Sequence, residues 1–407
     1  MDVRIEPRRL SGSVTPPPSK SMAHRLIIAA ALAGGVSTVE NTAMSQDIQA
    51  TLRCAEALGC SWEQPQEGTL IIRGSGGKRR TGELPHLDCG ESGSTLRFFI
   101  PIALALAGGG VFTGRGRLME RPQGPYAGLF PEKGIFWEQK DGVLTVRGSL
   151  TAGEYRLPGN VSSQFFTGLL FALPLIPGNS VIRSTTELES RDYIDMTIEA
   201  MRRAGVSVAE RPGLRCYEVT GSDYQPLTGT VEADWSQAGF WYAAAHLGSP
   251  VKIEGLNPFS VQGDRAAAEY AERLSRPGDV EIDVSGCPDL VPPLAVMAAV
   301  RQGVTRLSNA ARLRMKESDR LKTVHRMLSA LGGSVEEGPD SLTIHGVPRL
   351  TGGTVDGAND HRIVMAAAAA ACGCAGPVTI LGAEAVRKSY PDFFDVYRRL
   401  GGDVHVL

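Results

Sequence analysis

A cluster of serine, lysine and arginine side chains stands near the N-terminus, directly after three prolines. Ser19, Lys20 and Ser21 follow these prolines, and Arg25 comes four residues later at the start of a long apolar run. The prolines hold the entering chain extended, and serine is a residue that caps free backbone N–H groups at a helix start. Two cations in the first turns face the positive end of the helix dipole, so a phosphate or carboxylate between them would be stabilising. The plainer interpretation is a proline-rich linker into a buried helix with two solvated charges.

Five further apolar helices are expected to begin at a comparable polar cluster. The clusters lie at 91–97, 162–164, 234–236, 288–290 and 359–362, and further Lys and Arg candidates lie at 120–122, 190–193, 314–320 and 387–391. Any one cluster has the plain interpretation of an ordinary cap or a solvated helix start. Their joint placement at matched points of a repeat indicates helix N-termini and cations directed at small, multiply anionic ligands.

The elements that must position these clusters recur along the chain. A strand leads into an Ala-rich helix, then a strand, a second and amphipathic helix, and a pair of strands. The second helices are expected at 47–58, 193–204, 319–331 and 391–400, with a weaker candidate at 123–130. Six such units, of the form βαβαββ and spaced by roughly 55 to 75 residues, predict a layered α/β fold. The Ala-rich helices have almost no polar face, so we expect them to be buried on all sides among the sheets.

The ends of the chain predict how the six units divide. The last unit stops after one strand at 403–407, and the first begins within a hairpin, so the N-terminal strand should complete the C-terminal half. This predicts one three-unit domain over 14–229 and a second over 1–13 with 230–407, with the active site in the cleft between them. The fourth unit is shortened, because 264–288 leaves room for only a helix and one strand.

The composition is typical of a globular chain with two or three domains. Apolar residues make up 42 % of the 407 residues, charged residues 21 %, and the net charge is −2, so neither nucleic acid nor a membrane surface is an expected partner. The seven scattered cysteines indicate free thiols and a cytoplasmic location. Cys372 and Cys374 have no further ligand at metal-binding spacing and are expected to be core residues. The N-terminus shows no signal peptide, and the small-residue run at 366–371 is too short to span a bilayer.

Several of these segments resemble the EPSP (5-enolpyruvylshikimate-3-phosphate) synthases, a family of enolpyruvyl transferases. The resemblance runs in family order over nearly the whole chain. It rests on 18–21 with Arg25, Gly93 with Arg97, 120–122, 162–164, 190–196, 262–264, 288–289, 316–320, 360–362 and 388–393. It implies a two-domain inside-out α/β barrel made of the six repeats.

The resemblance also implies the reaction. The enolpyruvyl group of phosphoenolpyruvate (PEP) passes to the 5-hydroxyl of shikimate 3-phosphate, by addition and then elimination, and phosphate is released. This transferase step of aromatic amino acid biosynthesis needs a base, an acid and cations for the anionic groups. It needs no metal or redox cofactor. A monomer is expected, because the two halves cover each other's cleft face.

The resemblance assigns roles residue by residue. The catalytic residues would be Asp289 near the acceptor hydroxyl, Glu317 near the PEP methylene and Lys20 for proton transfer and the leaving phosphate. Shikimate 3-phosphate would be bound by Lys20, Ser21, Arg25, Ser162, Ser163, Gln164, Ser190, Arg191, Tyr193, Asp289 and Lys316. PEP would be bound by Lys20, Gly93, Arg97, Arg121, Gln164, Arg320, Arg362 and Lys388.

Three departures from the family pattern bear on this site. Glu91 stands where the family more often has Asn, Arg312 stands where Asn is usual, and the fourth repeat lacks room for its hairpin. One rival hypothesis is the same transfer to a UDP-sugar, but 113–121 lacks the cysteine that those enzymes usually carry in their catalytic loop. Another is a non-catalytic anion-binding protein, which would have no need of both Asp289 and Glu317. A divergent repeat protein without a ligand would not need matched cations at its helix starts.

Overall fold

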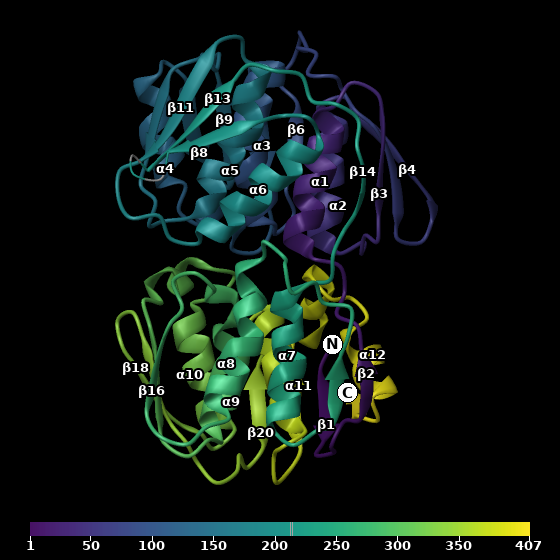
Figure 1. Cartoon of the computed structure of the whole chain (residues 1–407), viewed down its shortest axis with the longest axis vertical. Coiled ribbons are helices and arrows are strands. Elements are labelled where there is room, and N and C mark those ends of the chain that lie inside the picture. The colour runs from purple at the N-terminus through teal and green to yellow at the C-terminus, as the bar shows by residue number, and fades with distance from the viewer. Residues whose placement is uncertain (212, 214) are drawn as a thin grey trace. The chain divides into compact units, whose positions relative to one another are not determined.

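The computed structural model describes residues 1–211, 213 and 215–407. It divides the chain into two compact units. The continuous unit is Pro18–Glu232, and the discontinuous unit combines Met1–Pro17 with Ala233–Leu407. Figure 1 colours the elements of both units by residue number.

Helices and strands alternate through the continuous unit. In chain order they are α1 (Lys20–Leu32), β3 (Val36–Glu40), α2 (Gln46–Ala57), β4 (Ser61–Gln66), β5 (Thr69–Arg73), β6 (His86–Asp88), α3 (Gly93–Ala107), β7 (Gly109–Thr113), α4 (Gly124–Glu132), β8 (Phe136–Lys140), β9 (Val143–Arg147), β10 (Glu154–Leu157), α5 (Ser163–Ala172), β11 (Asn179–Ser184), α6 (Arg191–Arg203), β12 (Val208–Arg211), β13 (Cys216–Thr220) and β14 (Thr228–Thr230).

Among the described residues, the strands of the continuous unit form three four-stranded sheets that share one pattern of strand order and direction. Their strand orders are β14-β3-β5-β4, β6-β7-β9-β8 and β10-β11-β13-β12. In each sheet the first two strands are parallel, and the last two form an antiparallel hairpin. Because β14 at the end of the unit pairs with β3 near its start, one sheet joins the two ends of this unit.

The discontinuous unit is built from the same kinds of element. They are β1 (Val3–Glu6), β2 (Gly12–Val14), α7 (Trp235–His246), β15 (Val251–Ile253), α8 (Ala266–Leu274), β16 (Val280–Asp283), α9 (Val291–Ala299), β17 (Val304–Ser308), α10 (Arg320–Ala330), β18 (Ser334–Glu337), β19 (Leu342–His345), β20 (Gly353–Asp356), α11 (His361–Ala371), β21 (Val378–Leu381), α12 (Phe393–Arg399) and β22 (Asp403–Val406). Short 3-10 helices include η5 (Pro288–Leu290), η6 (Ala311–Met315) and η7 (Ala383–Lys388).

The N-terminal strand belongs to the last sheet of the discontinuous unit. That sheet has the order β20-β21-β1-β22, with β1 antiparallel to both β21 and β22. The N-terminal strand therefore completes the C-terminal repeat, as the sequence predicts. A second sheet, β16-β17-β19-β18, has the common construction.

The fourth repeat is short, as its length predicts. Within the described chain, β15 pairs with β2 in a two-stranded parallel sheet. The helix α8 follows, and the chain then enters β16 of the next sheet without forming a hairpin. The structure therefore has the mixed α/β fold class predicted from the repeats. It also has the shortened fourth repeat.

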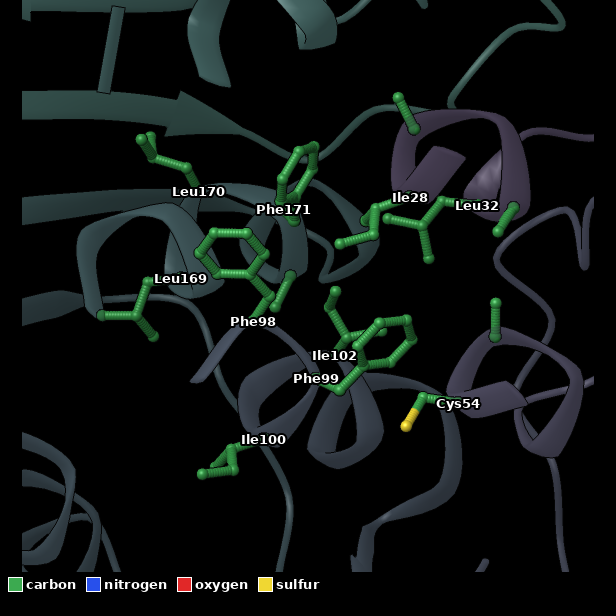
Figure 2. Close-up of a cluster of buried hydrophobic side chains, with 14 of the residues drawn as sticks. Ile28, Leu32, Cys54, Phe98, Phe99, Ile100, Ile102, Leu169, Leu170 and Phe171 are labelled. Atoms are coloured by element: carbon green, nitrogen blue, oxygen red, sulfur yellow. The ribbon is translucent and has the colours of Figure 1, made fainter. Parts of the chain in front are cut away.

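The Ala-rich helices are buried on all sides, as their lack of a polar face predicts. All nine residues of α9 and all eleven residues of α11 are buried. In the continuous unit, side chains of α1, α3 and α5 pack in one apolar core, where Phe98 and Phe171 meet edge to face at 6.3 Å between ring centroids (Figure 2). Each such aromatic or Leu side chain contributes about 1.5–3 kcal/mol on burial, so these helices hold their N-termini firmly in place.

Candidate active site

Serine residues define where the helices of the continuous unit begin. Ser19, Ser92 and Ser162 are the N-caps of α1, α3 and α5, and each accepts a hydrogen bond from a backbone N–H of the first turn. The caps satisfy donors that a helix start otherwise leaves without partners. The side chains that follow them are thereby held at fixed points.

Predicted site residues from α3 and α5 are joined by hydrogen bonds. An Nη of Arg97 donates to Oε1 of Gln164 at 2.8 Å, and Nε2 of Gln164 donates to Oγ of Ser94 at 2.9 Å. The other Nη of Arg97 donates to the carbonyl oxygen of Pro122 at 2.9 Å. The starts of α3 and α5 and the segment beside Arg121 therefore meet within the continuous unit.

Arg121 lies against Gly93 at the start of α3. A Cβ atom built on Gly93 would stand 2.4 Å from an Nη atom of Arg121, which is closer than real Cβ contacts come. Arg121 itself is buried. Glycine at this position therefore lets a guanidinium lie directly over the helix start, where it adds to the positive field of the helix dipole.

Lys20 has a carboxylate partner that is not among the site residues predicted from the sequence. Its Nζ lies 2.7 Å from Oδ2 of Asp47, and both side chains are largely buried. Asp47 lies in the first turn of α2. The sequence marks Asp47 only as an acidic residue at a predicted helix start. Such a residue ordinarily indicates a favourable interaction with the helix dipole and not a partner for a distant lysine.

Arg25 is held inside the continuous unit. Its Nε donates to Thr197, one Nη donates to the carbonyl of Ser21, and the other Nη donates to the carbonyl of Tyr193. These bonds are 2.7–2.9 Å long, and those to Thr197 and Tyr193 tie α1 to α6. Burial lowers the pKa of Arg25 to about 10, although Tyr193 acts in the opposite direction. In the structure, Arg25, which was predicted to bind shikimate 3-phosphate, links two helices.

The start of α6 holds the remaining candidates of the continuous unit. Ser190 is buried in a left-handed conformation, with φ of 53°. Arg191 is half-exposed, and its guanidinium forms an ion pair of 2.8 Å with Glu210. The structure therefore directs Arg191 to β12, whereas Ser162, Ser163 and Gln164 share the start of α5.

A second group of predicted residues meets in the discontinuous unit around Asp289 of η5. Its two carboxylate oxygens accept hydrogen bonds from Arg320 at 2.7 Å and from Arg362 at 2.8 Å. Nζ of Lys316 lies 3.6 Å away. Three of the four cations predicted in this part of the chain are therefore brought to one carboxylate.

Arg320 connects three carboxylates. Its guanidinium bonds Asp289, Glu317 and Asp360, and only 1 % of its side chain is exposed. Asp360 is fully buried, caps α11 and also accepts a hydrogen bond from Ser318 at 2.9 Å. In the sequence Asp360 stands within a motif but has no predicted role, because nothing local shows a contact that spans forty residues.

The close charges change how these groups titrate. Burial disfavours the charged carboxylate of Asp289, but Arg362, Lys316 and Arg320 outweigh burial and hold its pKa well below the usual range. Burial lowers the pKa of Lys316 to about 8, although Asp289 acts in the opposite direction. Asp289 is therefore ionised and Lys316 loses its proton near neutral to mildly alkaline pH.

Lys388 and Arg312 lie in the same unit. Nζ of Lys388 donates to the carbonyl of Asn359 at 2.7 Å, which places this buried cation next to the start of α11. Arg312, the departure noted in the sequence, is buried in η6 and donates to the carbonyl of Ser285 at 2.6 Å. It fits inside the fold without an exposed charge.

No helix in the described part of the chain has the length and apolar character needed to cross a membrane. Nor do any three His, Cys, Asp or Glu residues of the described ranges form a group that could hold a metal ion.

Comparison with known proteins gives one consistent result. A family model described as EPSP synthase (3-phosphoshikimate 1-carboxyvinyltransferase) matches residues 5–397. The 3-phosphoshikimate 1-carboxyvinyltransferase of Clostridium kluyveri is 43 % identical over 420 residues, covering 99 % of this chain and 98 % of the relative. The enzyme of that name from Clostridium acetobutylicum is 42 % identical over 422 residues, with the same coverage of 99 % and 98 %.

Solved structures agree with the sequence matches. EPSP synthase from Acinetobacter baumannii superimposes with a TM-score of 0.81 at 25 % identity, over 100 % of both chains. The enolpyruvyl transferase NikO from Streptomyces tendae shares the fold, with a TM-score of 0.76 at 18 % identity over 99 % and 98 % of the two chains. The chain belongs to the EPSP synthase family.

Proposed function

We propose that this chain transfers the enolpyruvyl group of PEP to the 5-hydroxyl of shikimate 3-phosphate. In the addition step, the oxygen bonds to C2 of PEP and a proton adds to the methylene carbon. In the elimination step, that methyl group loses a proton, the bond between C2 and the phosphate oxygen breaks, and phosphate leaves. The products are 5-enolpyruvylshikimate 3-phosphate and phosphate.

The observation that carries this proposal is the pairing of two acids on one buried guanidinium. Asp289 and Glu317 both bond Arg320. A site that only bound anions would gain nothing from two carboxylates among its cations, because each one repels the ligand. Addition followed by elimination, in contrast, needs one group to accept a proton and another to supply it. We propose that Asp289 accepts the proton of the acceptor hydroxyl and that Glu317 supplies the proton that adds to the methylene carbon.

The ion pairs of Asp289 support a role as a base that depends on substrate binding. With Arg320 and Arg362 on its two oxygens, its low pKa makes it a poor proton acceptor. Anionic groups of the substrates compete for the same guanidinium groups, and a carboxylate that loses cationic partners has a higher pKa. Substrate binding therefore raises the basicity of Asp289 at the moment when the acceptor hydroxyl arrives.

The remaining cations bind and orient the two substrates. Arg97, Arg121 and Gln164, with the glycine at position 93, form the part of the PEP site contributed by the continuous unit. Arg320, Arg362 and Lys388 contribute from the discontinuous unit. We propose that the two groups act on the same pair of substrates. Lys20, paired with Asp47, supplies a proton to the leaving phosphate.

Location and assembly are part of the proposal. All seven cysteines are free thiols and are buried. Free thiols are typical of a reducing compartment, so we infer a cytoplasmic location. We infer a monomer that uses two small-molecule substrates.

The proposal is tested by measuring phosphate release from PEP. We expect release that requires shikimate 3-phosphate, and Asp289→Asn to lower turnover by about 100-fold or more, because proton transfer by a positioned group contributes this much. Asp395→Asn is the matched control, since Asp395 is exposed in α12. Release that occurs with UDP-N-acetylglucosamine instead, or full turnover by Asp289→Asn, would contradict the proposal.

A further inference from the structure

A pocket with a cationic lining lies at the opposite ends of α7 and α11 from the residues discussed above. Its volume is about 510 Å³, and it lies wholly within the discontinuous unit. The lining includes Arg8, Arg9, Arg349, Gly248 and Gly373. A helix rises about 1.5 Å per residue, so the twelve residues of α7 place this pocket roughly 18 Å from Ser236 and Arg362.

The segment that carries Arg8 and Arg9 is held in place at both ends. It connects β1 to β2, and the buried Leu10 directly after it donates its backbone N–H to Oγ of Ser249 at 3.1 Å. The guanidinium of Arg9 lies beside Gly248, within 4 Å of where a Cβ atom of that glycine would stand. The guanidinium of Arg9 therefore lies against the backbone at the pocket, and Arg8 precedes it in the same segment.

The cations of the pocket could neutralise the C-terminal ends of helices or could bind an anionic ligand. Helices α7, α9 and α11 end here, and their C-terminal carbonyl groups favour positive charge. Arg349 interacts with such a helix end, because it donates hydrogen bonds to the carbonyls of Gly373 and Cys374, just after α11. Among the described residues, no ion pair or side-chain hydrogen bond involves Arg8 or Arg9, and no acidic residue lines the pocket. Helix ends therefore explain Arg349 but not the other two arginines.

We propose that this pocket binds a small organic phosphate, distinct from the substrates at the site described above. Planar guanidinium groups bind phosphate oxygens with paired N–H groups, and Arg8, Arg9 and Arg349 all line this pocket. Pro7, Leu247, Val300 and Pro348 offer apolar surface to an organic group attached to the phosphate. A volume of this size is within the range of small-molecule sites.

The test uses pyrophosphate as the probe and isothermal titration calorimetry on the full chain. We expect Arg8→Gln/Arg9→Gln to weaken binding at this pocket by about ten-fold or more, because two charged contacts are lost. The matched control is Arg273→Gln/Arg326→Gln, which removes the same charge from exposed positions on α8 and α10. Equal weakening by the two double variants would show a general charge effect and overturn the proposal, as would the absence of any binding.

Hydrogen exchange locates the bound probe independently of the calorimetry. Pyrophosphate should slow amide exchange in peptides that contain Gly248 and Gly373, both in the wild type and in Arg97→Gln. The same peptides should show no protection in Arg8→Gln/Arg9→Gln. Protection that disappears in Arg97→Gln would place the probe at the PEP-binding residues and overturn the pocket proposal, while leaving the proposed function untouched.

Discussion

At the residue scale, the candidate site depends on where small and charged side chains touch. Arg121 can lie over the start of α3 only because position 93 has no Cβ atom. The guanidinium of Arg320 bonds Asp289, Glu317 and Asp360, so a single side chain contacts both proposed acid–base groups. Small changes at such contacts should alter binding or turnover before they alter the fold.

We expect Gly93→Ala to raise KM for PEP by about ten-fold or more, since the added methyl group displaces the Arg121 guanidinium. The fold should survive, because the atoms it meets are the far end of a flexible side chain. Steady-state kinetics with both substrates measures the effect, and Gly128→Ala in α4, where a Cβ meets nothing within 4 Å, is the control. An unchanged KM for PEP would show that Arg121 does not bind this substrate.

At the element scale, burying a helix on all sides restricts the titration of its polar residues. His24 lies in the second turn of α1, 1 % exposed, with Nδ1 at 2.6 Å from Oγ1 of Thr51. Burial, and then the charges of Lys20 and Arg25, lower its pKa well below the ordinary value of 6.5. His24 is therefore neutral in the folded chain at pH values where it would be protonated in the unfolded chain.

This difference predicts that stability falls on acidification. Below pH 6.5 the unfolded state binds a proton at His24 that the folded state does not, so the free energy of unfolding decreases as pH falls. The decrease approaches about 1.4 kcal/mol per pH unit for one group. Urea unfolding at about pH 7.5 and about pH 5.5 should show a smaller decrease for His24→Gln than for the wild type. His405→Gln, at an exposed histidine, is the control, and equal decreases in all three proteins would contradict the assignment.

At the scale of the whole molecule, the chain leaves and re-enters the discontinuous unit, and strands from distant points close the sheets. β14 completes the first sheet of the continuous unit, and β1 completes the last sheet of the discontinuous unit. One apolar core extends from Met22 to Val231 entirely within the continuous unit. That unit therefore contains everything a separately folding domain requires.

We expect the fragment 18–232 to fold on its own, with a cooperative thermal transition followed by circular dichroism. The fragment 18–224 lacks β14 and the buried Leu227 and Val231, and it should melt at a lower temperature or fail to fold cooperatively. Fragments that melt identically would show that β14 does not stabilise the unit. Failure of 18–232 to fold would show that the continuous unit depends on the rest of the chain.

The sequence by itself determined the repeats, the six polar helix starts, the shortened fourth copy and the family. These features are local, because strand and helix periodicity, capping serines and helix-ending glycines are properties of neighbouring residues. The predicted second helices likewise lie within a few residues of α2, α6, α10 and α12.

Only the tertiary structure decided which charges meet. Asp47 pairs with Lys20, and Asp360 holds Arg320 across forty residues of chain. The structure also made Arg25 a link between two helices and directed Arg191 to Glu210. The energy of an ion pair depends on distance and burial, and neither is encoded in the spacing of residues along a sequence.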